Sequence, residues 1–76
     1  MIIENKYFEE LGFEHKDALW NYPIIIGTEK QNLSCNPENG KTYIDGKLMA
    51  VSKNIEDVKN LYYVIKGEKI NEVFTK

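Results

Sequence analysis

Arginine is absent from this chain: all ten basic residues are lysine. The bidentate guanidinium contacts that proteins often use to recognise phosphate, carboxylate or guanine are therefore unavailable. Twelve acidic residues give a net charge of −2, so the chain has no general attraction to nucleic acid or to an anionic membrane surface. Together with the many Ile, Asn, Glu and Tyr residues, the lysine bias suggests an AT-rich coding sequence. We therefore expect an origin in a low-GC bacterium, a phage or another mobile element.

Cysteine and histidine each occur once, as Cys35 and His15. A lone cysteine has no intrachain disulfide partner, and two soft ligands are too few for a structural zinc site, which usually takes four. We expect Cys35 to be a small buried hydrophobe and His15 to be a surface loop residue. Because no catalytic, cofactor-binding or metal-binding pattern can be recognised, the sequence predicts a protein that is not an enzyme.

Long hydrophobic runs are also missing. Apolar runs such as Ile24-Ile25-Ile26 are far too short for a transmembrane segment. The amino terminus has two apolar residues followed by charge, so no signal peptide is predicted. We expect a cytoplasmic protein made of one small domain, residues 1–76, whose short polar end, residues 68–76, docks loosely on the rest.

The stretch from Asn36 to Gly67 carries the clearest structural signals. Proline and an Asn-Gly pair within 36–40, followed by Asp45-Gly46, predict two tight turns between strands. Asn54 is a good N-cap with Asp57 three residues later, and Gly67 is a good stop. Between them a broad apolar stripe, with Leu61 at its middle, predicts an amphipathic helix over residues 55–66.

The first half of the chain is less explicit. Helical spacing of Phe8 and Leu11 predicts a short helix over 5–11 that ends at Gly12, with Phe13 packed back onto Phe8. Residues 14–18 have no clear period, so they could be loop or one more helical turn. From Trp20 the period changes to two, which indicates a strand. We therefore predict an α+β fold: a short N-terminal helix, a three- to four-stranded antiparallel meander, and a C-terminal helix packed on one sheet face.

The aromatic residues are more numerous than so small a core needs. Most of them can cover the sheet, but those left exposed would suit a protein interface, where Tyr and Trp dominate the binding energy. The residues predicted to bind a partner are Trp20, Tyr22, Tyr43 and Tyr63. We expect that partner to be another protein, and a homodimer would also relieve a marginal core. The alternative is a single-stranded nucleic-acid-binding module that uses sheet aromatics to stack bases.

From Leu33 to Ile65 the chain resembles the closing strand, hairpin and helix of the SUKH superfamily of immunity proteins. The similarity rests on the Asn-Gly hairpin and on the helix after Ser52, and it covers under half of the chain. These features are generic to small α+β domains. The resemblance is therefore an analogy of architecture and implies no functional residues.

Overall fold

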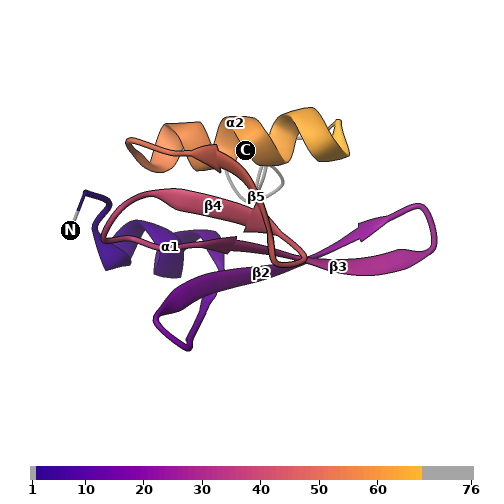
Figure 1. Ribbon diagram of the computed structural model, residues 1–76. Coiled ribbons are helices and arrows are strands. Elements are labelled where there is room, and N and C mark those ends of the chain that lie inside the picture. Colours follow the sequence, from indigo (N-terminus) through magenta and orange to yellow (C-terminus); the bar gives the residue numbers. More distant parts are fainter. Residues whose placement is uncertain (1, 68–76) are drawn as a thin grey trace.

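A helix, five strands and a second helix follow one another along the chain (Figure 1). The computed structural model describes residues 2–67, so the predicted docking of residues 68–76 lies outside the described part. The elements are α1 (Asn5–Leu11), β1 (Glu14–Lys16), β2 (Leu19–Ile26), β3 (Glu29–Cys35), β4 (Lys41–Ile44), β5 (Lys47–Val51) and α2 (Ile55–Lys66).

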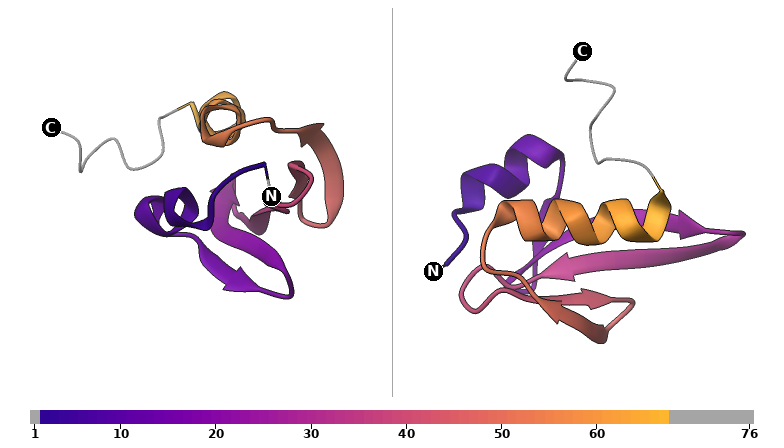
Figure 2. Two further views of the ribbon diagram at one scale, coloured as in Figure 1. Left: turned by 90° about the vertical axis from the view of Figure 1, so that its left-hand side faces the viewer. Right: turned by 90° about the horizontal axis from the view of Figure 1, so that it is seen from above.

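The strands form one antiparallel meander in the order β1-β2-β3-β4-β5. Both helices lie on the same face of this sheet, which curls around them (Figure 2). The predicted α+β fold is confirmed, but the sheet has five strands rather than three or four. The other face of the sheet carries no helix within residues 2–67.

The additional strand is β1, in the stretch for which loop or helix was expected. It pairs with β2 through a two-residue turn in which Asp17 and Ala18 have φ of 54° and 65°. Two successive positive φ values give the twist that a tight hairpin needs, although Asn and Gly are the usual residues there. His15 consequently lies on an exposed strand rather than in a loop.

The covered face of the sheet supplies half of the core. Across the ladder, Trp20 lies opposite Cys35, and Cys35 lies opposite Thr42, so these three side chains share the face. All three are buried. The helices contribute further buried side chains, Phe8 and Leu11 from α1 and Val58 and Tyr62 from α2. On α2 the centre of the stripe is thus Val58 and Tyr62, while Leu61 is only partly buried.

Both helices end as their sequences predict. Gly12 has φ of 90°, its N–H donates to the Glu9 carbonyl, and Phe13 N–H donates to the Phe8 carbonyl, which together make a Schellman motif. The Phe8 and Phe13 rings meet edge to face with centroids 5.3 Å apart. This contact fixes the direction in which the chain leaves α1 toward β1.

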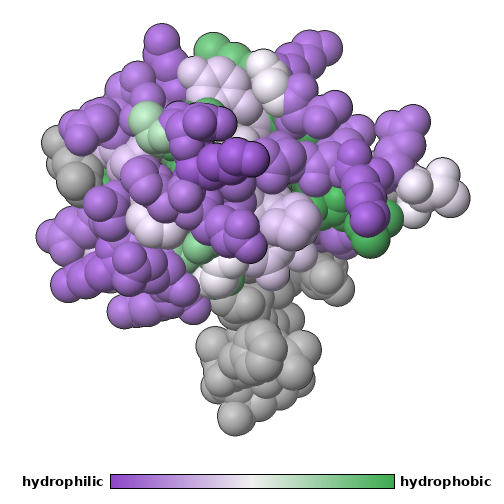
Figure 3. All heavy atoms as spheres, turned by 90° about the horizontal axis from the view of Figure 1, so that it is seen from below, coloured by the Kyte–Doolittle hydropathy of each residue, from purple (hydrophilic) through white to green (hydrophobic). Residues whose placement is uncertain are grey.

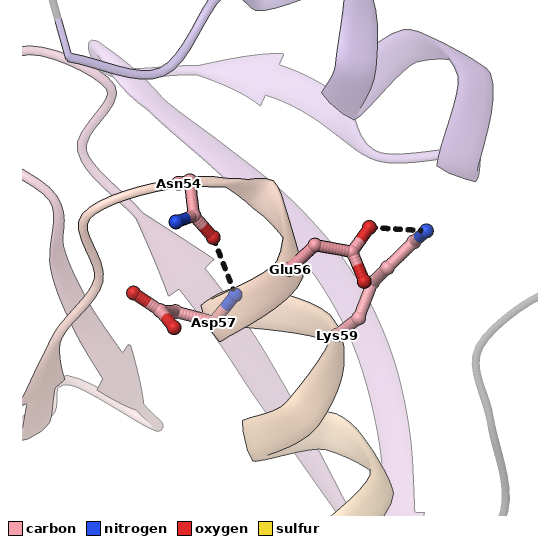
Figure 4. A network of polar contacts seen from close by, with 4 residues as sticks. All are labelled: Asn54, Glu56, Asp57 and Lys59. Carbon is pink, nitrogen blue, oxygen red and sulfur yellow. Dashed lines mark hydrogen bonds and ion pairs between the residues drawn. The ribbon is translucent and has the colours of Figure 1, made fainter.

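At the start of α2 the Asn54 side chain accepts a 3.0 Å hydrogen bond from Asp57 N–H (Figure 4). The Asp57 carboxylate in turn accepts from the backbone N–H of Lys53 at 2.8 Å. The two side chains therefore satisfy donors on both sides of the helix start, as in a capping box. An ion pair between Lys59 and Glu56 lies on the exposed side of the same helix.

Candidate interaction surface

Trp20, the first aromatic residue predicted to bind a partner, is 5% exposed and belongs to the core. Its indole stacks on Phe8 with ring centroids 5.6 Å apart, and its N–H donates to the Asn5 side chain at 2.9 Å. The indole N–H and one face of the ring thus have partners inside the molecule. The prediction that Trp20 meets a partner does not fit this burial, because α1 covers the ring.

Tyr22 is the next member of the same aromatic cluster. Its ring lies 5.0 Å from that of Phe13 and 5.6 Å from that of Tyr62, measured between centroids. It is half-buried, and it joins α1, β2 and α2 through a continuous series of ring contacts. Tyr22 therefore stabilises the packing of both helices on the sheet.

Tyr43 and Tyr63 are placed differently from these two. Tyr43 is half-buried on β4, where it pairs with Ser34 on one side and Leu48 on the other, on the face opposite to the core. Tyr63 is 46% exposed on α2, beside the still more exposed Val64. Of the four predicted residues, these two are the ones that a partner could reach.

Cys35 is fully buried, as predicted, and the hydroxyl of Thr42 donates to its sulfur at 3.5 Å. Burial raises the pKa of the Cys35 thiol, so the sulfur keeps its proton at neutral pH. His15 is exposed and lies against the Trp20 ring, with centroids 4.8 Å apart. Nowhere among the described residues do three His, Cys, Asp or Glu side chains gather as a metal site would require.

Among residues 2–67, the largest group of exposed apolar side chains lies on β5, a strand that holds none of the residues predicted to bind a partner. Leu48, Met49 and Val51 are 52%, 51% and 58% exposed, and all three belong to one five-residue strand. Tyr43 lies directly across the ladder from Leu48. We call these four residues the β5 patch. Isolated exposed apolar residues are ordinary on protein surfaces, but a contiguous group indicates an interaction site.

The two edges of the sheet are built differently. β1 has three residues, Glu14, His15 and Lys16, and a short charged strand discourages pairing with another chain. β5 is longer and carries the β5 patch, and β4 is its one neighbour in the five-stranded order. A β-bulge between Leu48 and Ala50 makes this edge irregular. The β5 edge thus has one charged residue, Lys47, and a bulge, and it is less protected from pairing than the fully charged β1 edge.

A signal for the β5 patch is present in the sequence. Residues 48–51 read Leu-Met-Ala-Val. This run lacks the alternation of apolar and polar residues that is typical of a strand with one solvent-exposed face. An apolar run on the last strand of a meander implies apolar side chains on both faces at an edge. This strand is aliphatic, so a prediction based on aromatic residues does not include it.

The centre of the open sheet face is polar, in contrast to its β5 margin. Asn21 accepts hydrogen bonds from the Ser34 hydroxyl and the Asn32 amide, each at 2.8 Å, and the Asn32 amide also donates to Ser34 at 3.0 Å. Seen from below, on the side away from α2, most of the surface is hydrophilic and apolar residues show at its margins (Figure 3). The apolar surface on this side therefore lies at the edges of the sheet face rather than at its centre.

Comparison with family models, with curated proteins and with solved structures gives no match for this chain. The resemblance of residues 33–65 to the SUKH superfamily therefore has no support from these comparisons. No helix within residues 2–67 combines the length and the apolar character needed to cross a bilayer.

Proposed function

We propose that this chain is a small non-enzymatic protein-binding module, an accessory, regulatory or inhibitor protein, and that its partner docks on the β5 patch. The observation that carries the proposal is the exposure of Leu48, Met49 and Val51 on one edge strand. Each is more than half exposed, and together with Tyr43 they form an apolar margin beside free backbone groups. Such an edge is costly to leave bare, because it invites pairing with other chains.

The chemistry of the remaining candidate residues fits a binding role better than a catalytic one. The Cys35 thiol is buried with a raised pKa, whereas a nucleophilic cysteine needs access and a lowered pKa. His15 lies against an indole, which supplies neither a proton acceptor nor a nucleophile. The cytoplasm is the proposed setting, in keeping with a single unpaired cysteine.

The alternative, single-strand nucleic-acid binding, draws less support. Base stacking needs aromatic side chains along an accessible sheet face. Trp20 and Tyr22 face the helices, which leaves Tyr43 as the accessible aromatic residue among the described strands. We expect a labelled oligonucleotide to show no saturable binding at low salt, where lysine-driven binding would be strongest.

The proposed function is tested by affinity capture from an extract of the source cell. Full-length protein is compared with the double variant Leu48→Glu/Val51→Glu and with Ile25→Glu. Ile25 is a matched control because it is 53% exposed on β2, outside the β5 patch. We expect the specific partner to be retained by wild type and by Ile25→Glu and to be lost by the double variant. An unchanged set of captured proteins on the double variant would overturn the proposal.

A further inference from the structure

The backbone of β5 has hydrogen-bonding groups that face away from the sheet. In an antiparallel ladder the residues of a strand direct their N–H and C=O alternately to the two sides. Asp45 N–H donates to the Asn32 carbonyl at 2.8 Å, and Tyr43, two residues earlier on β4, pairs with Ser34 of β3. Tyr43 therefore directs its backbone groups toward β3. Its partner Leu48 directs its N–H and C=O outward, to the free side of β5.

Lysine outnumbers acid along β4 and β5, although Asp57 also lies at this end of the sheet, where its carboxylate accepts from Lys53 N–H. Residues 41–53 hold three lysines, Lys41, Lys47 and Lys53, against one acidic residue, Asp45, whereas the chain as a whole has a net charge of −2. Lys41 lies directly opposite Val51 in the ladder, Lys47 is the first residue of β5, and Lys53 follows the end of β5 by two residues. All three are exposed, and within residues 2–67 their ammonium groups make no ion pair or hydrogen bond.

We infer that the β5 patch binds an extended segment of another protein in which apolar residues alternate with acidic ones, and that this segment adds to the sheet beside β5. The inference rests on the proposed function and names the chemistry of the partner. Backbone groups of the segment pair with those of Leu48, which is the usual source of affinity in strand addition. Its apolar side chains cover Leu48 and Val51 on one face, and its carboxylates project from the other face toward Lys47.

A second copy of this chain is the competing occupant of the same edge. Pairing two β5 strands about a two-fold axis would bring the lysines of both copies into one interface, and Asp45 is the one acid that each copy offers within residues 41–53. Like charges at an interface oppose association. An acidic partner instead places carboxylates beside Lys47, so the charges favour it over a dimer.

The test uses the full chain and two fluorescently labelled synthetic peptides, one of alternating glutamate and valine and one of alternating lysine and valine. We expect the glutamate peptide to bind at least about tenfold more tightly at low salt, and the difference to shrink in high salt because the lysines are exposed. The triple variant Lys41→Glu/Lys47→Glu/Lys53→Glu should reverse the preference. Equal binding of both peptides to wild type, or no reversal, would overturn the inference.

Strand addition itself is tested with Leu48→Pro against Leu48→Ala. Proline removes the outward N–H of residue 48 and, since that N–H does not bond β4, leaves the ladder intact. Both variants truncate the side chain, so we expect Leu48→Pro to bind the glutamate peptide at least about tenfold more weakly than Leu48→Ala. Thermal melts confirm that both are folded, and equal binding by the two variants would rule out strand addition.

Light scattering of the wild type shows whether a second copy of this chain, rather than another protein, occupies the β5 edge. A dimer that Leu48→Pro converts to a monomer would assign the edge to a second copy and overturn the inference. In another outcome, the double variant Leu48→Glu/Val51→Glu loses the captured cellular partner while the glutamate peptide fails to bind the wild type. That pair of results would contradict this inference but support the proposed function. Retention of the partner by that double variant would contradict the proposed function itself.

Discussion

Leu33 and Leu61 are the same residue type in different surroundings. Comparing their substitutions therefore shows how much burial of one side chain contributes to stability. Leu33 is fully buried on β3, between Tyr22 and Ile44 in the ladder, whereas Leu61 is partly buried at the side of α2. Removing a fully buried leucine side chain costs the transfer free energy and leaves a cavity. A half-covered side chain loses less on both counts.

We therefore expect Leu33→Ala to lower the free energy of unfolding by about 2–5 kcal/mol. Leu61→Ala should cost less than half as much as Leu33→Ala. Tyr63→Ala is the control: with a side chain 46% exposed, it should leave the melting temperature nearly unchanged. Urea titrations of the three variants measure the costs, and a Leu61→Ala loss equal to that of Leu33→Ala would show that the stripe on α2 is centred on Leu61.

The buried thiol of Cys35 makes stability depend on pH in a defined direction. Burial raises its folded-state pKa above the ordinary value of 9.0, so above that pH the unfolded chain loses the proton while the folded chain keeps it. The protonated Cys35 thiol therefore contributes its full stabilisation of the folded state below the thiol pKa of the unfolded chain. This contribution declines as pH rises beyond that pKa. We expect the free energy of unfolding to fall from about pH 8 to pH 10. Cys35→Ala should be less stable overall but flatter over this range, as measured by urea titration, and an equal slope in both proteins would contradict the assignment.

At the scale of elements, α2 is held by its first turn as well as by its apolar face. Asn54 satisfies the Asp57 N–H, and Asp57 satisfies the Lys53 N–H. Asn54→Ala leaves one of these donors without its side-chain partner, so we expect a loss of about 1 kcal/mol. Thermal melts should show a fall of about 4–8 °C for a domain of this size. Asn60→Ala, at an exposed mid-helix position, is the control and should cost nothing; an equal fall for both variants would mean that the cap contributes nothing specific.

The elements differ in how far the sequence predicts them. The bounds of α2 follow from Asn54 and Gly67, because capping is a local interaction between residues close in sequence. β1 escapes prediction because its three residues are all exposed and carry no alternation, and its turn uses Asp17 and Ala18 at positive φ. A strand that buries nothing leaves no hydrophobic period in the sequence.

The candidate surface was predicted less well than the fold for a related reason. Alternation indicates that Trp20 and Tyr22 share a face of β2, but whether that face is covered depends on where α1 and α2 pack. Such packing joins residues far apart in sequence, which a local pattern cannot reveal. The exposure of Leu48 likewise depends on the position of β5 at the end of the strand order. Aromatic content alone is thus a poor guide to which side chains are exposed.

At the scale of the whole molecule, stability should vary along the β2–β3 hairpin. β3 pairs with β4 over Leu33–Cys35, whereas between Ile24 and Gln31 the hairpin continues as a two-stranded ribbon beyond β4 (Figure 1). A two-stranded ribbon is marginal by itself. One tie to the rest of the fold is Lys66 at the end of α2, whose ammonium group donates to the Ile25 carbonyl.

Hydrogen exchange tests this gradient. We expect the amides from Ile25 to Lys30 to exchange faster than those of Leu33–Cys35, because local opening of this end of the ribbon leaves the buried Ile24 in place. Lys66→Met keeps an apolar stem but removes the donor, which is worth about 0.5–1.5 kcal/mol, so exchange in the ribbon should accelerate by about two- to tenfold. Lys59→Met, whose native ion pair with Glu56 lies within α2, should leave the ribbon unchanged. Uniform exchange along the hairpin would mean that the ribbon opens only with the whole fold. Equal effects of the two variants would mean that Lys66 does not anchor the ribbon.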